Sequence, residues 1–145
     1  MTIPERIGKA NIFAFAHAYM VHIQKIVREL GEVEARRRLE GLDRVSVRTA
    51  LLPNQMPSGR FDLIVVSELL YYMRLRDADR LVRKLAHAIV PGGRIVLLHH
   101  HTDFNDAAQK PDLAQKRACT TLSKRMVLRY HYRDRRFDCA SFVAR

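Results

Sequence analysis

Two short apolar runs joined by one amphipathic segment limit the possible folds of this chain most strongly. Residues 61–66 read FDLIVV and residues 94–99 read RIVLLH, and both runs are nearly continuous apolar sequence. Between them, residues 77–89 carry apolar side chains at three- and four-residue spacing, which predicts a helix. Runs of this kind are typical of central parallel strands covered on both faces. Strand, helix, a Pro-Gly-Gly turn at 91–93 and strand therefore predict a right-handed βαβ unit.

The C-terminal third predicts a helix and a hairpin. Residues 111–122 are expected to form the helix. Residues 126–132 and 136–143 alternate apolar with polar side chains, and only 133–135 separate them, so we expect an antiparallel pair. Parallel strands with connecting helices and a closing hairpin make the fold class α/β.

The N-terminal third is less regular. Apolar side chains at three- and four-residue spacing predict a helix over residues 11–30, with Asn11 as its N-cap. A short charged helix at 32–40 and a strand at 45–49 are expected to follow.

Length and composition predict one soluble domain. The 145 residues, 48% hydrophobic and 28% charged, form a single domain, 1–145, with an N-terminal helical segment at 1–31 and a core at 33–145. No run approaches the ~20 apolar residues that span a bilayer, and the first residues lack the order of a secretory signal. These features predict a cytoplasmic protein without a membrane anchor, whose Cys119 and Cys139 are free thiols.

A formal net charge of +11 favours anionic partners, nucleic acid among them. The arginines are scattered along the chain and no nucleic-acid motif accompanies them, so solvated basic surfaces are the favoured interpretation. Nucleic acid stays open as an alternative partner.

Three ordered motifs resemble class I S-adenosylmethionine-dependent methyltransferases. They are FDLIVVSELLYYM at 61–73, PGGRIVLL at 91–98 and YHYRDRRF at 130–137. The Ser-Glu-x-Leu-Tyr-Tyr form is similar to the nodulation protein S type, and the resemblance covers about residues 33–145. It implies a Rossmann-like sheet of parallel strands ending in an antiparallel hairpin. It also implies methyl transfer from S-adenosylmethionine to an amine or hydroxyl of a small-molecule or saccharide acceptor.

The sequence departs from this family where the cofactor is held. The family's glycine-rich loop lets the backbone approach the cofactor closely, and no such loop occurs here. Leu51 stands where the family usually carries an acidic residue. We therefore expect an incomplete class I methyltransferase sheet with an added N-terminal helix. The alternative function is a non-catalytic, truncated methyltransferase-like domain that acts as a binding or oligomerisation module.

Candidate site residues lie at the expected carboxyl ends of two strands, where ligands bind in open α/β sheets. The resemblance implies Glu68 and Tyr72 as catalytic residues, and Ser67, Glu68 and Tyr71 as cofactor-binding residues. His99, at the end of the next parallel strand, is a further catalytic candidate because a histidine can take a proton near neutral pH. Glu68 would accept a hydrogen bond from the acceptor, Tyr72 would line the methyl channel, and His99 would act as a base.

Strand alternation places His99 and His101 on one face and His100 on the other. A metal site would need a further ligand, and no second histidine or cysteine cluster has matching spacing, so no metal is predicted.

The apolar face of the predicted N-terminal helix needs a partner. Two hypotheses follow: the helix covers the exposed edge of the incomplete sheet, or it joins two chains in a homodimer.

Overall fold

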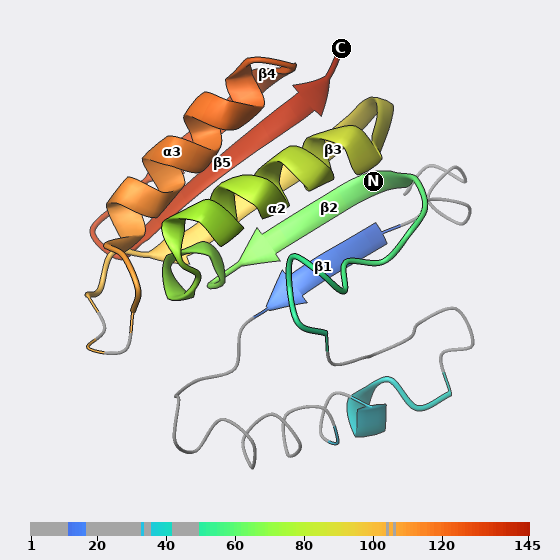
Figure 1. Cartoon of the computed structure of the whole chain (residues 1–145), viewed down its shortest axis with the longest axis horizontal. Coiled ribbons are helices and arrows are strands. Elements are labelled where there is room, and N and C mark those ends of the chain that lie inside the picture. The colour runs from blue at the N-terminus through green and yellow to red at the C-terminus, as the bar shows by residue number, and fades with distance from the viewer. Residues whose placement is uncertain (1–11, 17–32, 34–35, 42–49, 104, 106) are drawn as a thin grey trace.

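The computed structural model describes residues 12–16, 33, 36–41, 50–103, 105 and 107–145. Within these residues, one five-stranded sheet has the order β1-β2-β3-β5-β4. The strands are β1 (Ile12–Ala16), β2 (Phe61–Ser67), β3 (Ile89–His100), β4 (Met126–Arg133) and β5 (Phe137–Ala144). The helices are the 3₁₀ turn η2 (Leu70–Tyr72), α2 (Leu75–Ala88) and α3 (Pro111–Ser123). Figure 1 shows α2 and α3 side by side over the sheet.

The parallel βαβ unit is confirmed. β2 and β3 pair in parallel, with Val66 opposite Leu97 and Ser67 opposite Leu98, and α2 connects them. The carboxyl ends of both strands therefore meet at the same edge of the sheet.

The C-terminal hairpin is also confirmed. β4 and β5 pair antiparallel, and β5 pairs antiparallel with β3. Asp134 closes the turn between β4 and β5. Its Oδ1 accepts hydrogen bonds from the backbone N–H groups of Arg136 (2.7 Å) and Phe137 (2.8 Å). The Asp134 carboxylate thus acts as the acceptor for two backbone N–H groups of the turn, in place of backbone carbonyl oxygens.

The prediction of a helix beginning at Asn11 is wrong over its first turns. Residues Ile12–Ala16 form β1, which pairs in parallel with β2 from Leu63 to Ser67. The edge of β2 offers unpaired backbone groups that a strand satisfies and a helix does not. The remainder of that helix, and with it the covering and homodimer hypotheses, lies outside the described residues, as does the strand expected at 45–49.

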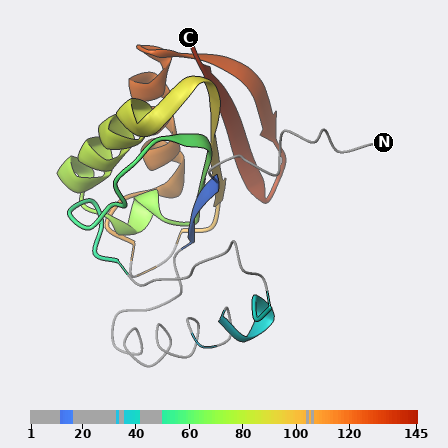
Figure 2. The same ribbon diagram turned by 90° about the vertical axis from the view of Figure 1, so that its right-hand side faces the viewer.

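The core lies between the sheet and the two helices, which Figure 2 shows on one side of the sheet. It combines a stripe of α2 and α3 with the side chains of β2, β3 and β5 that face them. Its members include Ile64, Val66, Leu81, Leu85, Ile95, Leu97, Leu122 and Phe142. Both cysteines are free thiols, as predicted. Among the described residues, no helix has the length and apolar character needed to cross a membrane.

Candidate functional site

The candidate site begins where β2 ends. Ser67 is the last residue of β2, and Glu68 follows it with a φ of 54°, in the left-handed region that non-glycine residues rarely adopt. The backbone N–H of Glu68 donates to the carbonyl oxygen of Leu98 at 3.0 Å. This bond ties the sharp turn after β2 to β3. Strained backbone of this kind clusters at functional sites.

Glu68 and Tyr71 form the centre of the site. The Tyr71 hydroxyl donates a hydrogen bond to Oε2 of Glu68. Tyr71 is buried, and burial, together with the neighbouring Glu68 carboxylate, raises the pKa of Tyr71 far above its usual value, so the hydroxyl stays a proton donor. Within the described part of the chain, Oε1 of Glu68 is buried and has no hydrogen-bond partner. A buried polar atom in that state costs about 1–3 kcal/mol and calls for an explanation.

Two further side chains border Glu68. His100 lies with Nε2 at 3.9 Å from Oε1 of Glu68, and its ring packs on Phe137 at a centroid distance of 4.2 Å. The ring of Tyr72 packs against that of Tyr71 at 4.5 Å. The structure thus brings together Ser67, Glu68, Tyr71 and Tyr72 from the sequence-based set. His100 was missed as a site residue, although alternation had already placed it on a different face from His99.

His99 lies on the other face of β3, beneath α3. It is only 4% exposed, and its Nε2 lies 3.4 Å from Oδ1 of Asp112. Burial lowers the pKa of His99, while the hydrogen bond with Asp112 opposes that shift. A cavity of about 10 Å³ adjoins it, bordered among others by Tyr71 and Gln115. His99 is therefore a neutral, enclosed histidine in this structure, not a neighbour of the Glu68 carboxylate.

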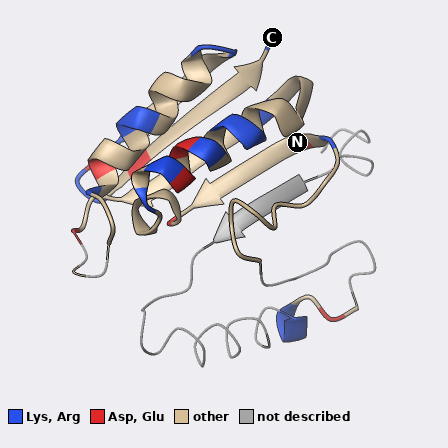
Figure 3. Cartoon of the chain, viewed as in Figure 1, with Lys and Arg blue, Asp and Glu red and all other residues tan. Residues whose placement is uncertain are grey.

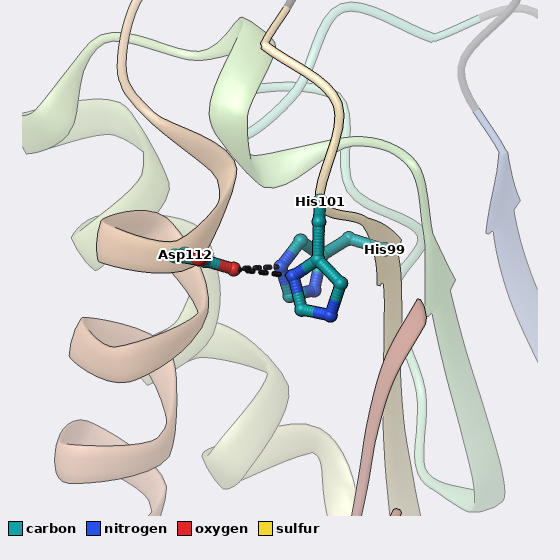
Figure 4. Close-up of side chains that lie close together, drawn as sticks. All are labelled: His99, His101 and Asp112. Atoms are coloured by element: carbon teal, nitrogen blue, oxygen red, sulfur yellow. Dashed lines mark hydrogen bonds and ion pairs between the residues drawn. The ribbon is translucent and has the colours of Figure 1, made fainter. Parts of the chain in front are cut away.

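Asp112 joins His99 to His101 and Arg133. Its Oδ1 lies 2.7 Å from Nδ1 of His101, and its Oδ2 accepts a hydrogen bond from the guanidinium of Arg133 at 3.0 Å (Figure 4 shows the two histidines). Burial acts to raise the pKa of Asp112, but the hydrogen bonds from both histidines and the Arg133 charge outweigh it and lower that pKa. No local sequence pattern predicts this contact, because Asp112 belongs to a helix and lies 13 residues from His99.

A separate hollow of about 490 Å³ runs along α2, away from the strand ends. Two of its polar side chains bond to the protein itself: Lys84 Nζ donates to the Pro53 carbonyl at 3.0 Å, and His87 Nδ1 lies 2.7 Å from the Arg83 carbonyl. Arg80 and Arg83 also line the hollow, and none of the predicted site residues borders it.

The fit to S-adenosylmethionine is incomplete. Ala16 of β1 lies opposite Ser67, so Ser67, Glu68 and Tyr71 are the described residues that could contact a cofactor at the ends of β1 and β2. The six residues that follow β1 in the sequence read HAYMVH and contain no glycine. A segment of this composition lacks the glycines that let a backbone approach a cofactor closely.

Sequence comparisons find no match, whereas structural comparisons find proteins of similar fold. No protein-family model and no curated protein matches the sequence. The N-methyltransferase NodS from Bradyrhizobium japonicum WM9 in complex with S-adenosyl-L-homocysteine matches with a TM-score of 0.63 at 19% identity, over 81% of this chain and 62% of that chain. A second NodS structure from the same organism matches with a TM-score of 0.67 at 17% identity, over 93% of this chain and 85% of that chain. A methyltransferase from Pseudomonas syringae, described as putative, matches with a TM-score of 0.65 at 22% identity, over 97% of this chain and 90% of that chain.

At identities below 25%, these matches establish the fold and no more. The chain spans 62% of the length of the NodS complex structure, so NodS has parts with no counterpart here. This chain has the parallel β2–β3 pair and the antiparallel β4–β5 pair that the sequence motifs implied. The chain is structurally similar to class I S-adenosylmethionine-dependent methyltransferases, including NodS.

Proposed function

We propose that this chain serves S-adenosylmethionine-dependent methyl transfer to an amine or hydroxyl of a small-molecule or saccharide acceptor. One observation carries the proposal: Oε1 of Glu68, at the carboxyl end of a central parallel strand, is buried without a hydrogen-bond partner in the described residues. Ligands bind at this edge in open α/β sheets, and an acceptor N–H or O–H would satisfy that oxygen. The likeness to NodS, solved with S-adenosyl-L-homocysteine, supports the reaction class.

Each oxygen of Glu68 has its own task in this proposal. Tyr71 holds Oε2 and so fixes the orientation of the carboxylate. Oε1 accepts the hydrogen bond of the acceptor, and it takes the acceptor proton once the acceptor's lone pair is committed to a new bond. When bound, S-adenosylmethionine supplies an electrophilic methyl group.

The remaining candidates take supporting roles. Ser67, at the junction of β1 and β2, is proposed to contact the cofactor, and Tyr72 is proposed to line the acceptor side. His99 is the other proposed base, but it is 4% exposed and hydrogen-bonded to Asp112. It would touch an acceptor only after α3 moved, so we assign the proton to Glu68.

Calorimetric titration with S-adenosylmethionine and S-adenosylhomocysteine tests cofactor binding. The methyl-transfer test adds glucosamine and small primary amines and measures S-adenosylhomocysteine formation. Glu68→Gln keeps the shape of the side chain but removes the proton acceptor, and a loss of about 100-fold in rate is expected. Glu40→Gln, at an exposed glutamate outside the site, is the matched control and should leave the rate unchanged.

A protein that gives no heat with either ligand up to millimolar concentration would exclude the enzyme for this chain. That outcome would favour the alternative, a non-catalytic methyltransferase-like module, which the missing glycine loop supports.

The nucleic-acid alternative has weaker support. Figure 3 shows basic residues at several places along the ribbon of α2, α3 and the adjoining segments, with acidic residues between them. Among the residues that the structure describes, the basic residues therefore do not form one continuous band for a nucleic-acid backbone. Binding to generic RNA that weakens steeply with salt would favour this alternative.

A further inference from the structure

We propose that His99, His101 and Asp112 form a binding site for a transition-metal dication, with Zn²⁺ as the best match. One ligand atom from each residue lies within 4.8 Å of those of the other two. Oδ1 of Asp112 lies 3.4 Å from Nε2 of His99 and 2.7 Å from Nδ1 of His101, which are the proposed ligand atoms. Figure 4 shows both imidazole rings beside the carboxylate, which comes from the first turn of α3.

The distances suit a four-coordinate ion. Tetrahedral Zn²⁺ with bonds of about 2.0–2.1 Å holds its ligand atoms about 3.3 Å apart. The His99–Asp112 pair is already 3.4 Å apart. The His101–Asp112 pair, at 2.7 Å, is a hydrogen bond that would lose its proton and open by about 0.6 Å.

The ligand set selects the kind of ion. Two imidazoles and one carboxylate suit Zn²⁺ and its neighbours Co²⁺, Ni²⁺ and Cu²⁺, whereas Mg²⁺ and Ca²⁺ prefer oxygen ligands alone. Three protein ligands leave a fourth position, which water would fill on the exposed side of Asp112.

A hydrogen-bonded cluster without metal is the rival explanation. Nδ1 of His99 and Nε2 of His101 are buried without a partner in the described residues whether or not an ion is bound, so they do not distinguish the two explanations and the titration must. Arg133 is the main charge against a cation. It bonds to Oδ2 of Asp112 and not to Oδ1, so it leaves the proposed ligand atom available and holds the carboxylate in orientation.

The site would link the end of β3 to the start of α3. His99 and His101 flank the last residue of β3, and Asp112 is the second residue of α3. A bound ion would therefore stabilise the packing of α3 on the sheet. The side chains of the proposed metal site lie on the face of β3 opposite His100, which borders Glu68 on the other face. The metal proposal is therefore independent of methyl transfer.

Calorimetric titration of ZnCl₂ into the untagged, chelator-treated chain tests the site. We expect binding of one ion per chain. His101→Gln and Asp112→Asn should each weaken it at least 10-fold. His87→Gln, on the outer face of α2, is the matched control and should bind as the original chain does. Saturating Zn²⁺ should raise the Tm of the original chain and of the His87 variant but not of the other two.

Absorption spectroscopy with Co²⁺ provides a second readout on the original chain. Tetrahedral nitrogen and oxygen ligation gives intense visible bands that hydrated Co²⁺ lacks, so the test holds even if a variant fails to fold. The proposal is overturned if the original chain binds no Zn²⁺ and shows no such bands. It is equally overturned if folded His101 and Asp112 variants bind as tightly as the original.

Discussion

Nε2 of His100 lies 3.9 Å from Oε1 of Glu68, across the carboxyl ends of β3 and β2. The side chain of His100 is 38% exposed, whereas that of Glu68 is 18% exposed. The histidine therefore lies between a mostly enclosed carboxylate and the solvent. In the proposed reaction, a proton taken up at Oε1 can leave through His100.

His100→Gln tests this route. Because the substitution removes a titratable group but leaves Glu68 in place, the rate of S-adenosylhomocysteine formation should fall by about 10- to 100-fold, with KM for the acceptor little changed. His87→Gln should have no effect. An unchanged rate in His100→Gln, alongside a large loss in Glu68→Gln, would show that the proton leaves Glu68 by another path.

Tyr71→Phe tests the contact that orients the carboxylate. The buried hydroxyl donates to a charged acceptor, so its removal should lower the free energy of unfolding by about 1.5–3 kcal/mol. Urea denaturation measures the change. Tyr130→Phe makes the same chemical change at a side chain that is 54% exposed, and it should cost about 0.5 kcal/mol or less. Equal effects of the two substitutions would contradict the role of the Tyr71–Glu68 bond.

Most elements beyond residue 60 could be predicted because each carries its own local signal. The apolar stripe of α2 and the alternation of β4 and β5 are each visible over fewer than fifteen residues. Residues 91–93, predicted as a turn before the strand, lie inside β3. β1 has no such signal. Ile12, Phe15 and Ala16 fit a helical stripe as well as a strand, and the parallel partner that decides between them lies about fifty residues away.

The site was predicted in part for the same reason. Glu68 and Tyr71 follow a recognisable strand directly, so their position at its carboxyl end could be inferred. Alternation separates His99 from His100 but does not say which face α3 covers, and that packing decides which histidine meets Glu68. The contact of Asp112 with His99 and His101 depends on the docking of α3, which no local pattern encodes.

Gly93→Ala tests the close packing at the start of β3, where the pairing with β2 is irregular between Ile89 and Arg94. A Cβ at Gly93 would lie 2.8 Å from Cγ1 of Ile89 and 2.9 Å from the Val90 carbonyl oxygen, closer than van der Waals contact permits. The neighbours would have to shift, at a cost of about 1–3 kcal/mol in the free energy of unfolding. Gly93→Val should cost more than Gly93→Ala in the same urea denaturation series. If the free energies of unfolding do not follow this order, the backbone around Gly93 can shift to accept a side chain at little cost.

Cys119 should resist alkylation in the folded chain. Burial, assisted by the charge of Asp138, raises the pKa of the Cys119 thiol to about 11. At about pH 8 only about one thiol in a thousand is then the reactive thiolate. Iodoacetamide labelling followed by mass spectrometry should therefore be much slower at Cys119 in the native protein than in the protein unfolded in urea. Equal rates in the two states would show that Cys119 is accessible in the folded chain and that burial against the sheet does not protect its thiol.

Asp134 should make the stability of the hairpin depend on pH. The hydrogen bonds from the backbone N–H groups of Phe137 and Arg136 hold the pKa of Asp134 below its ordinary value of 3.8. Because the folded state favours the ionised form, the stabilisation is fully present above pH 3.8 and is lost as the pH falls through the lower pKa of the folded state. Asp134→Ala should lower the Tm at pH 7, and the difference from the original chain should shrink as the pH falls below 3.8. Asp134→Asn keeps an oxygen that can accept both hydrogen bonds but does not titrate, so its Tm should fall less steeply with acid than that of the original chain. A difference between the original chain and Asp134→Ala that stays constant across this range would show that the carboxylate charge does not stabilise the turn.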